Sequence, residues 1–191
     1  FKSVIKTTRR MNYHDVNDIF KFADMKDGKT ELTGEELARV NNVAEKYKEF
    51  IPHFLRMREL KNALKQRRDL NGSLNLDIPE SKIILDENGI AVDIQKYDYL
   101  ESNEVIEQFM LTANESVAEK FYWLQAPFIY RVHDVPDIEK VNDLNKFLFN
   151  LGYKIRGVKK DDEDSIHPKA FAQVLEEVKG KPEERVVSNL I

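Results

Sequence analysis

Residues 71–97 read NGSLNLDIPESKIILDENGIAVDIQKY, an island of alternating, β-branched sequence between two long helical stretches. The run from Lys82 to Leu85 is apolar, and DENG precedes a second β-favouring run, IAVDIQKY. Asn88–Gly89 favours a turn because both residues tolerate positive φ. The stretch therefore predicts a small antiparallel hairpin of two or three strands at 71–97.

Acidic side chains in this island raise the alternative of a divalent metal site. Four carboxylates lie in it or at its bend: Asp77, Glu80, Asp86 and Glu87. No histidine or further ligand cluster lies nearby, so the solvated rim of a hairpin is the better interpretation. A second acidic run, 161–164, lies between Gly157 and Pro168 without a scaffold that would converge its oxygens. We predict no metal site in the chain.

The sequence on both sides of the island is mainly helical. Within 1–70, FKSVIK predicts a strand, and Asn12 is expected to cap a first helix. Thr33 and Glu36 form a capping-box pattern, and Pro52 predicts the start of a further helix. At 98–191 we expect one long helix, a short strand at PFIYRVH, and helices beginning near 136, 167 and 182. The predicted class is α+β, predominantly helical, with the hairpin and short strands in one domain spanning 1–191.

Length, net charge and composition limit the classes of protein to which the chain can belong. The chain has 191 residues, a net charge of −4 and no cysteine, which fits a cytoplasmic location and excludes disulfides and thiolate sites. No apolar run approaches the roughly 18 residues of a membrane span. Phe1 begins inside an apolar run, and Ile191 ends inside what looks like an amphipathic helix. We expect a piece of a longer protein, packed against other parts of its own chain.

One helix, at about 104–121, contains a candidate site. A helical wheel puts Glu104 and Gln108 on a wet arc and Ile106, Phe109 and Met110 in a core stripe. Glu107 and Asn114 fall on the apolar side of the wheel, seven residues and two turns apart. A carboxylate there needs a partner. Structural satisfaction by a neighbouring side chain is one interpretation of the pair, and a functional site is the other.

Two basic groups could contact phosphates. The first is a stripe on a single helix face and consists of Arg58, Lys61, Lys65 and Arg68. The second lies near the start of the chain and consists of Lys2, Lys6, Arg9 and Arg10. Either could neutralise a nucleic-acid backbone, and either could be an ordinary solvated face. Composition alone favours the second interpretation.

Five segments, in order, resemble a known family: KSVIKTTRRMNYHDV, NGSLNLDIPESKIILDENG, VIEQFMLTANESVAEKF, PFIYRVHDVPD and GKPEERVVSNLI. They resemble the central part of the RNB-type catalytic domain of the ribonuclease II/ribonuclease R family, and its bacterial ribonuclease R members above all. The resemblance runs from end to end of the chain. It implies a processive 3′-to-5′ exoribonuclease that uses Mg²⁺ to hydrolyse single-stranded RNA to nucleoside monophosphates, without a small-molecule cofactor or a membrane.

The resemblance also implies roles for single residues. Glu107 matches a family glutamate near the 3′-terminal nucleotide, and Asn114 an asparagine of the same helix. Leu76 stands where the family usually has an aromatic residue that stacks on terminal bases, so that clamp departs from the pattern. Recurring family positions that line the channel or serve structure are matched by Arg10, Arg131 and His133. The remaining RNA-binding candidates come from the basic helix stripe and not from the resemblance: Lys61, Lys65 and Arg68.

The chain lacks other parts of the family pattern. The metal ligands of the family come from an aspartate-rich motif of the type D-P-x-x-A-x-D-x-D-D, which does not occur in these 191 residues. The resemblance therefore implies a parent enzyme whose magnesium ligands lie outside this chain, and an inactive fragment. The alternative from another class is a non-catalytic helical module that binds a protein partner.

Overall fold

The computed structural model describes residues 2–74, 80–133, 136–157 and 166–191. The chain divides into two compact units, the first made of 1–65 and 98–124 and the second of 66–97 and 125–191. Leu76, Asp77 and the acidic run 161–164 lie outside the described residues. Across the described part of the chain, no helix combines the length and apolarity that a membrane crossing requires.

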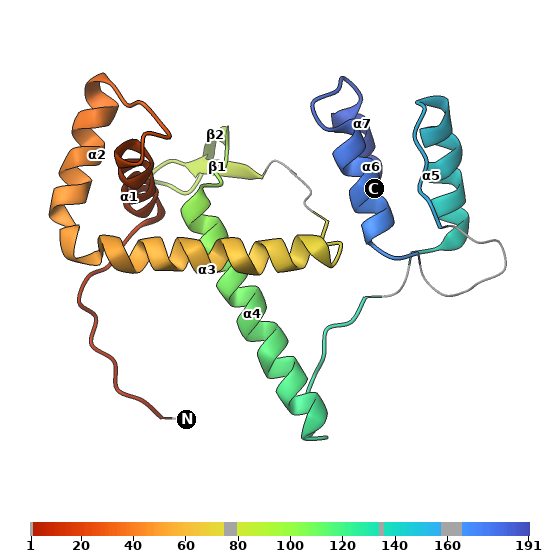
Figure 1. The fold of residues 1–191 in the computed structure, drawn as a ribbon, viewed down its shortest axis with the longest axis horizontal. Coiled ribbons are helices and arrows are strands. Elements are labelled where there is room, and N and C mark those ends of the chain that lie inside the picture. Colours follow the sequence, from red (N-terminus) through yellow and green to blue (C-terminus); the bar gives the residue numbers. More distant parts are fainter. Residues whose placement is uncertain (1, 75–79, 134–135, 158–165) are drawn as a thin grey trace. The chain divides into compact units, whose positions relative to one another are not determined.

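Unit 1 is helical. It contains α1 (Tyr13–Lys26), α2 (Gly34–Lys46), a 3₁₀ turn η1 (Lys48–Phe50), most of α3 (Ile51–Leu70) and α4 (Glu101–Trp123) (Figure 1). The predicted cap is confirmed, because the Asn12 side chain accepts a hydrogen bond from the Asp15 N–H at 2.8 Å. Pro52 lies in the first turn of α3, where its missing N–H costs nothing.

The capping box predicted at Thr33 is wrong. Thr33 precedes α2, but its side chain makes no capping hydrogen bond. The Glu36 carboxylate instead accepts a hydrogen bond from the Lys21 amine of α1 at 2.5 Å. A cation on the neighbouring helix thus competes successfully for the carboxylate that the box would have used.

One apolar cluster of unit 1 lies where α1, α3 and α4 meet, separate from Ile19, Val40 and Ala44, which are buried on α1 and α2. Val16 and Phe20 of α1 and Val105 of α4 are buried there. Around them pack partly buried side chains: Met11, Phe54, Leu55, Met57 and Phe109. So few apolar residues leave much of the contact between α3 and α4 to polar groups.

The hairpin in unit 2 confirms the prediction for the quoted stretch. Strand β1 (Ser81–Leu85) pairs antiparallel with β2 (Ala91–Lys96), with Ile83 opposite Ile94 and an irregularity after Ile84. The Asp86 carboxylate accepts the N–H groups of Asn88 and Ile90, at 2.8 and 2.9 Å. Asp86 is therefore a turn residue, as the solvated-rim interpretation requires.

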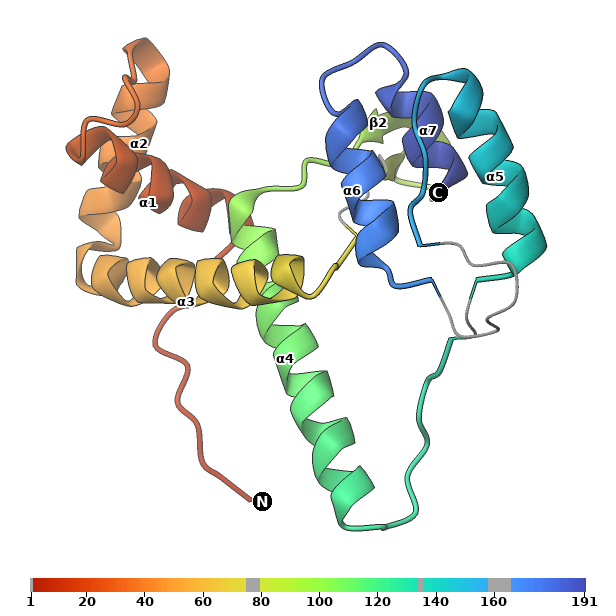
Figure 2. The ribbon, with the colours of Figure 1, turned by 45° about the vertical axis from the view of Figure 1, so that its right-hand side comes forward.

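Unit 2 also contains α5 (Ile138–Asn150), α6 (Lys169–Val178) and α7 (Glu184–Leu190), which Figure 2 shows at the end of the chain. Their apolar faces form the α5–α7 core, made of Val141, Leu148, Tyr153, Ile155, Phe171, Val174, Val178 and Val187. The Asn145 side chain fixes the segment after α5, because it bonds both the N–H and the carbonyl of Ile155. The three predicted helices are confirmed.

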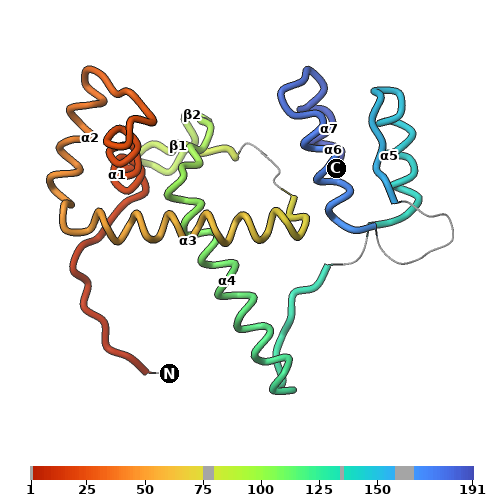
Figure 3. The backbone as a smooth tube through the Cα atoms, in the orientation of Figure 1, coloured from red at the N-terminus to blue at the C-terminus, as the bar shows by residue number. Residues whose placement is uncertain are grey.

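Two predicted strands are wrong. The segments FKSVIK and PFIYRVH have no regular secondary structure in their described residues, and both run as uncoiled tube in Figure 3. Val4 and Ile129 are 97% and 96% exposed. Strand propensity is expressed only where a neighbouring strand and a packed face exist. In the described residues the sheet consists of β1 and β2. The class itself, α+β and mainly helical, is confirmed.

Candidate functional site

The first half of α4 packs through a polar face. Its buried residues are Ser102, Val105 and Gln108, spaced three apart. The Ser102 hydroxyl donates to the Tyr13 carbonyl at 2.7 Å, which joins α4 to the start of α1. The wheel was wrong here: Gln108 is 6% exposed, whereas Ile106 of the expected core stripe is 38% exposed.

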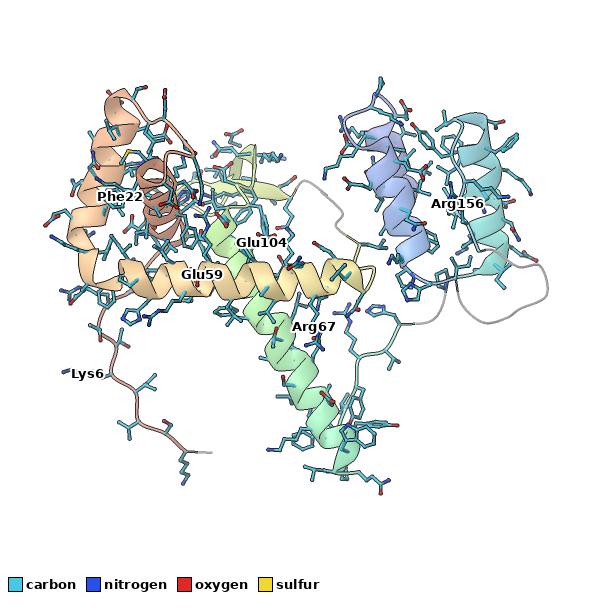
Figure 4. The ribbon with its side chains drawn as sticks, viewed as in Figure 1. Lys6, Phe22, Glu59, Arg67, Glu104 and Arg156 are labelled. Atoms are coloured by element: carbon cyan, nitrogen blue, oxygen red, sulfur yellow. The ribbon has the colours of Figure 1, made fainter. Side chains whose placement is uncertain are left out.

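The reason is a group of charged residues that we call the α3–α4 ionic junction: Asp24, Arg58, Lys61, Lys65, Glu101 and Glu104. The Arg58 guanidinium contacts both oxygens of Asp24 at 2.8 Å and donates to Glu101 at 2.9 Å. The Lys61 amine donates to Glu101 and to Glu104, at 2.9 Å each. Lys65 also donates to Glu104, which Figure 4 labels on the turn of α4 beside α3.

The junction shifts the pKa values of Asp24, Arg58, Glu101 and Glu104. The hydrogen bond from Arg58 lowers the pKa of Asp24 below its ordinary value. Burial alone would raise the pKa values of Glu101 and Glu104, but the cations of α3 outweigh it and hold both below the ordinary value. The pKa of Arg58 is raised, chiefly by its hydrogen bond to Asp24. All of these groups are therefore charged at neutral pH.

This arrangement differs from the exposed basic stripe that the sequence suggested. Lys61 is 3% exposed and is surrounded by carboxylates. Lys65 pairs with Glu104, and Arg68 is half-buried. RNA binding by these three residues stays a prediction, and it would require phosphates to replace carboxylates at Lys61 and Lys65. The other basic group, at residues 2–10, is exposed.

Glu107 and Asn114 both lie on the exposed surface of α4. The Glu107 carboxylate accepts a hydrogen bond at Oε2 from the hydroxyl of Tyr99, the second residue before the helix. Sequence reasoning sought a partner for Glu107 and did not find this one. Tyr99 precedes the helix, so helical spacing in the sequence does not reveal this contact.

Three of the remaining candidates, Arg10, Arg131 and His133, lie in segments without regular secondary structure. Arg10 is exposed in unit 1, and Arg131 and His133 are exposed in unit 2. Leu76 lies outside the described residues, so the structure places no side chain at that clamp position. The RNA-contacting or structural roles of all four stay predictions.

Metal-ligating side chains do not gather in the part of the chain that the structure describes. There, no three residues of the types His, Cys, Asp and Glu lie close enough together to hold a metal ion. The carboxylates of the ionic junction are instead occupied by cations of α3. The described residues therefore do not fit the Mg²⁺ that the resemblance implies, and we derive no chemical step through a metal.

Comparison with known proteins identifies the family. The RNB domain model matches residues 1–191. Ribonuclease R 1 of Lactococcus lactis is 32% identical over 190 residues, which are 100% of this chain and 21% of that protein. Ribonuclease R of Aquifex aeolicus is 41% identical over 134 residues, 70% of this chain and 18% of that protein. The chain thus spans about a fifth of the length of these relatives.

Solved structures agree on the fold. Mycoplasma genitalium RNase R in complex with ribose-methylated single-stranded RNA superposes with a TM-score of 0.60 at 21% identity, covering 90% of this chain and 24% of that one. The same protein in complex with double-stranded RNA gives 0.60 at 22% identity, over 90% and 28%. With the model match over its full length, this chain belongs to the RNB domain family.

Proposed function

We propose that this chain is part of a 3′-to-5′ exoribonuclease that hydrolyses single-stranded RNA to nucleoside monophosphates. The observation that carries the proposal is the RNB match over residues 1–191 together with the exposed Glu107 within VIEQFMLTANES. Glu107 would position the 3′-terminal nucleotide by accepting a hydrogen bond, because an ionised carboxylate can only accept. Asn114, two turns further along α4, would contribute an amide that both donates and accepts.

The 191 residues alone would be inactive. In two-metal hydrolysis, several carboxylates converge to hold ions that activate water and stabilise the leaving oxygen. The described residues offer no such set. Positioning by Glu107 would then have no activated water to serve. Mg²⁺ would be held by residues outside this chain in the intact protein.

The test compares the 191-residue chain with the intact protein that contains it, using a labelled single-stranded RNA with Mg²⁺ or Mn²⁺. The intact protein should release mononucleotides, and the chain alone should release none. In the intact protein, Glu107→Ala should slow degradation or lengthen the end product. Glu119→Ala, an exposed glutamate on the same helix, should leave both unchanged. Mononucleotide release by the chain alone would overturn the inactivity proposal.

RNA binding by the chain alone would be weak and sensitive to salt. The exposed basic group at residues 2–10 could make about four phosphate contacts, which predicts a log–log slope of affinity against salt near about −3 for a single strand. Affinity that stays constant over a tenfold salt increase would exclude this mode of binding.

Exposed apolar residues on α4, among them Met110 at 59% and Val117 at 45%, favour the alternative of a protein-binding module. An intact protein that does not degrade RNA would leave that alternative.

A further inference from the structure

Tyr99 contacts Glu107, the residue proposed to position the 3′ end of the RNA. Tyr99 itself has no role in the function proposed above. The Tyr99 hydroxyl donates to Oε2 of Glu107 across eight residues of sequence. Tyr99 directly precedes Leu100, the residue that caps α4. The Leu100 N–H donates to the Asn103 side chain at 3.1 Å, so the backbone beside Tyr99 is tied to the first turn of the helix. The Tyr99 side chain therefore extends along α4 from a backbone position that this hydrogen bond restrains.

An exposed glutamate without a partner has three rotatable side-chain bonds and samples many rotamers. A hydrogen bond from a hydroxyl to a carboxylate is charge-assisted and short, and so restricts that sampling. Tyrosine suits this task because its ring has only two χ angles to fix. The carboxylate has about four lone-pair sites on two oxygens, so one bond to Oε2 leaves acceptor capacity for a hydroxyl of a bound nucleotide.

We propose that Tyr99 is a positioning residue that holds the Glu107 carboxylate in the orientation in which it accepts a hydrogen bond from the terminal nucleotide of the RNA. The proposal rests on the function proposed above for Glu107. Tyr99 itself does not contact the reacting atoms. Its effect passes through Glu107, and this distinguishes it from a residue that only secures the start of α4.

The distinction decides what each variant should do. A residue that orients a group for the reaction lowers kcat more than it raises KM, whereas a uniform binding contact raises KM. Loss of a hydroxyl that acts only through Glu107 has no further effect once the carboxylate is gone. A residue that only secures the helix start would instead lower stability, with the same effect on rate whether or not Glu107 is present.

The experiment is a double-mutant cycle in the intact protein: Tyr99→Phe, Glu107→Ala and both together, with single-turnover degradation of a labelled single-stranded RNA. Tyr99→Phe keeps the ring and should lower the rate about tenfold, the size of one charge-assisted hydrogen bond, with KM changed less than about twofold. In the Glu107→Ala background the same change should have no effect. Tyr122→Phe is the matched control, because its ring packs against Trp123 at the other end of α4.

The outcomes separate the two proposals. If Glu107→Ala leaves degradation unchanged, the function proposed for Glu107 fails, and the role of Tyr99 fails with it. If Glu107→Ala slows degradation but Tyr99→Phe does not, or slows it equally in both backgrounds, only the positioning role is overturned. A rise in KM alone would also overturn it. Thermal unfolding of each variant identifies a rate loss that comes from misfolding, which would count against the proposal when it accompanies Tyr99→Phe.

Discussion

The α3–α4 ionic junction in unit 1 and the α5–α7 core in unit 2 hold helices together by opposite means. The junction buries the Lys61 amine among carboxylates of α4, beside a small apolar cluster. The α5–α7 core buries Leu148, Ile155 and Val178 completely. Removal of apolar surface from water stabilises the second region. In the first, charge attraction must offset the cost of desolvating the same charges.

This difference predicts two mutational signatures. Truncation in an apolar core costs stability through the buried groups it removes and the cavity it leaves. A buried ionic group depends on complete pairing, because removal of one partner leaves the others desolvated and uncompensated. Four changes can test the comparison, the first with the largest expected effect.

Leu148→Ala should destabilise the α5–α7 core most. Leu148 is 0% exposed, so truncation removes buried methyl groups and leaves a cavity, at a cost of about 2–5 kcal/mol in the free energy of unfolding. Urea unfolding read by amide hydrogen exchange in α5–α7 measures it. The neighbouring Phe149 is 74% exposed, and Phe149→Ala should change stability by less than about 0.5 kcal/mol. Equal losses at both positions would mean that α5 buries a different face.

Lys61→Met should weaken the ionic junction by about 1–3 kcal/mol, below the range for a fully buried pair because the carboxylates keep some exposure to water. Glu101 and Glu104 lose their shared cation, although Arg58 and Lys65 remain. Amide exchange in α3 and α4 measures the loss. Lys146→Met is the control: its amine pairs with Asp143 at 2.7 Å on the exposed surface of α5, and an exposed pair contributes about 0–1 kcal/mol. Equal losses of stability for Lys61→Met and Lys146→Met would contradict the comparison.

The sequence predicted one of these regions far better than the other. Local start signals near 136, 167 and 182 indicated α5, α6 and α7, because such signals act on the chain itself and do not depend on which helix packs alongside. The assignment of a buried face by apolar spacing failed for α4, where Gln108 is buried and Ile106 is not. Charged residues on a wheel look solvated, and only the position of Lys61 on α3 decides that Glu104 faces another helix. Glu107 could be selected from sequence, but Tyr99 could not, since it precedes the helix and its reach depends on backbone geometry.

Acidification should weaken the junction before it affects the α5–α7 core. The pKa values of Asp24, Glu101 and Glu104 are lowered from ordinary values of 3.8 for Asp and 4.5 for Glu. Because the folded values lie below the unfolded ones, the stabilisation is complete above the unfolded values and is lost as pH falls through the folded ones. The loss should appear below pH 4.5 and not between pH 5 and 7, with an effect limited by the partial exposure of the carboxylates.

Amide exchange in α3 and α4, followed from pH 7 to pH 3, measures this change. Lys61→Met should reduce the pH dependence, because the variant has already lost part of the interaction that protonation removes. Loss of protection in α3 and α4 near pH 6 would point to a histidine, and would contradict the assignment to these carboxylates.

The smallest expected effect concerns a polar group of α4 that the junction does not satisfy. The Oε1 atom of Gln108 is buried and has no hydrogen-bond partner among the described residues. A buried acceptor without a partner costs about 1–3 kcal/mol of desolvation, which no hydrogen bond offsets. Gln108→Leu has similar volume and removes that acceptor, so it should be neutral or stabilise unit 1 by up to about 1 kcal/mol in the free energy of unfolding. Gln66→Leu, at an exposed position within α3, is the control for the general effect of adding an apolar side chain to a helix. A loss above about 1 kcal/mol in Gln108→Leu alone would show that the amide is satisfied in solution, by water or by residues outside the described part. In that case the polar face of α4, like its charged face, would require every partner to be present, and the comparison with the α5–α7 core would extend from ions to neutral groups.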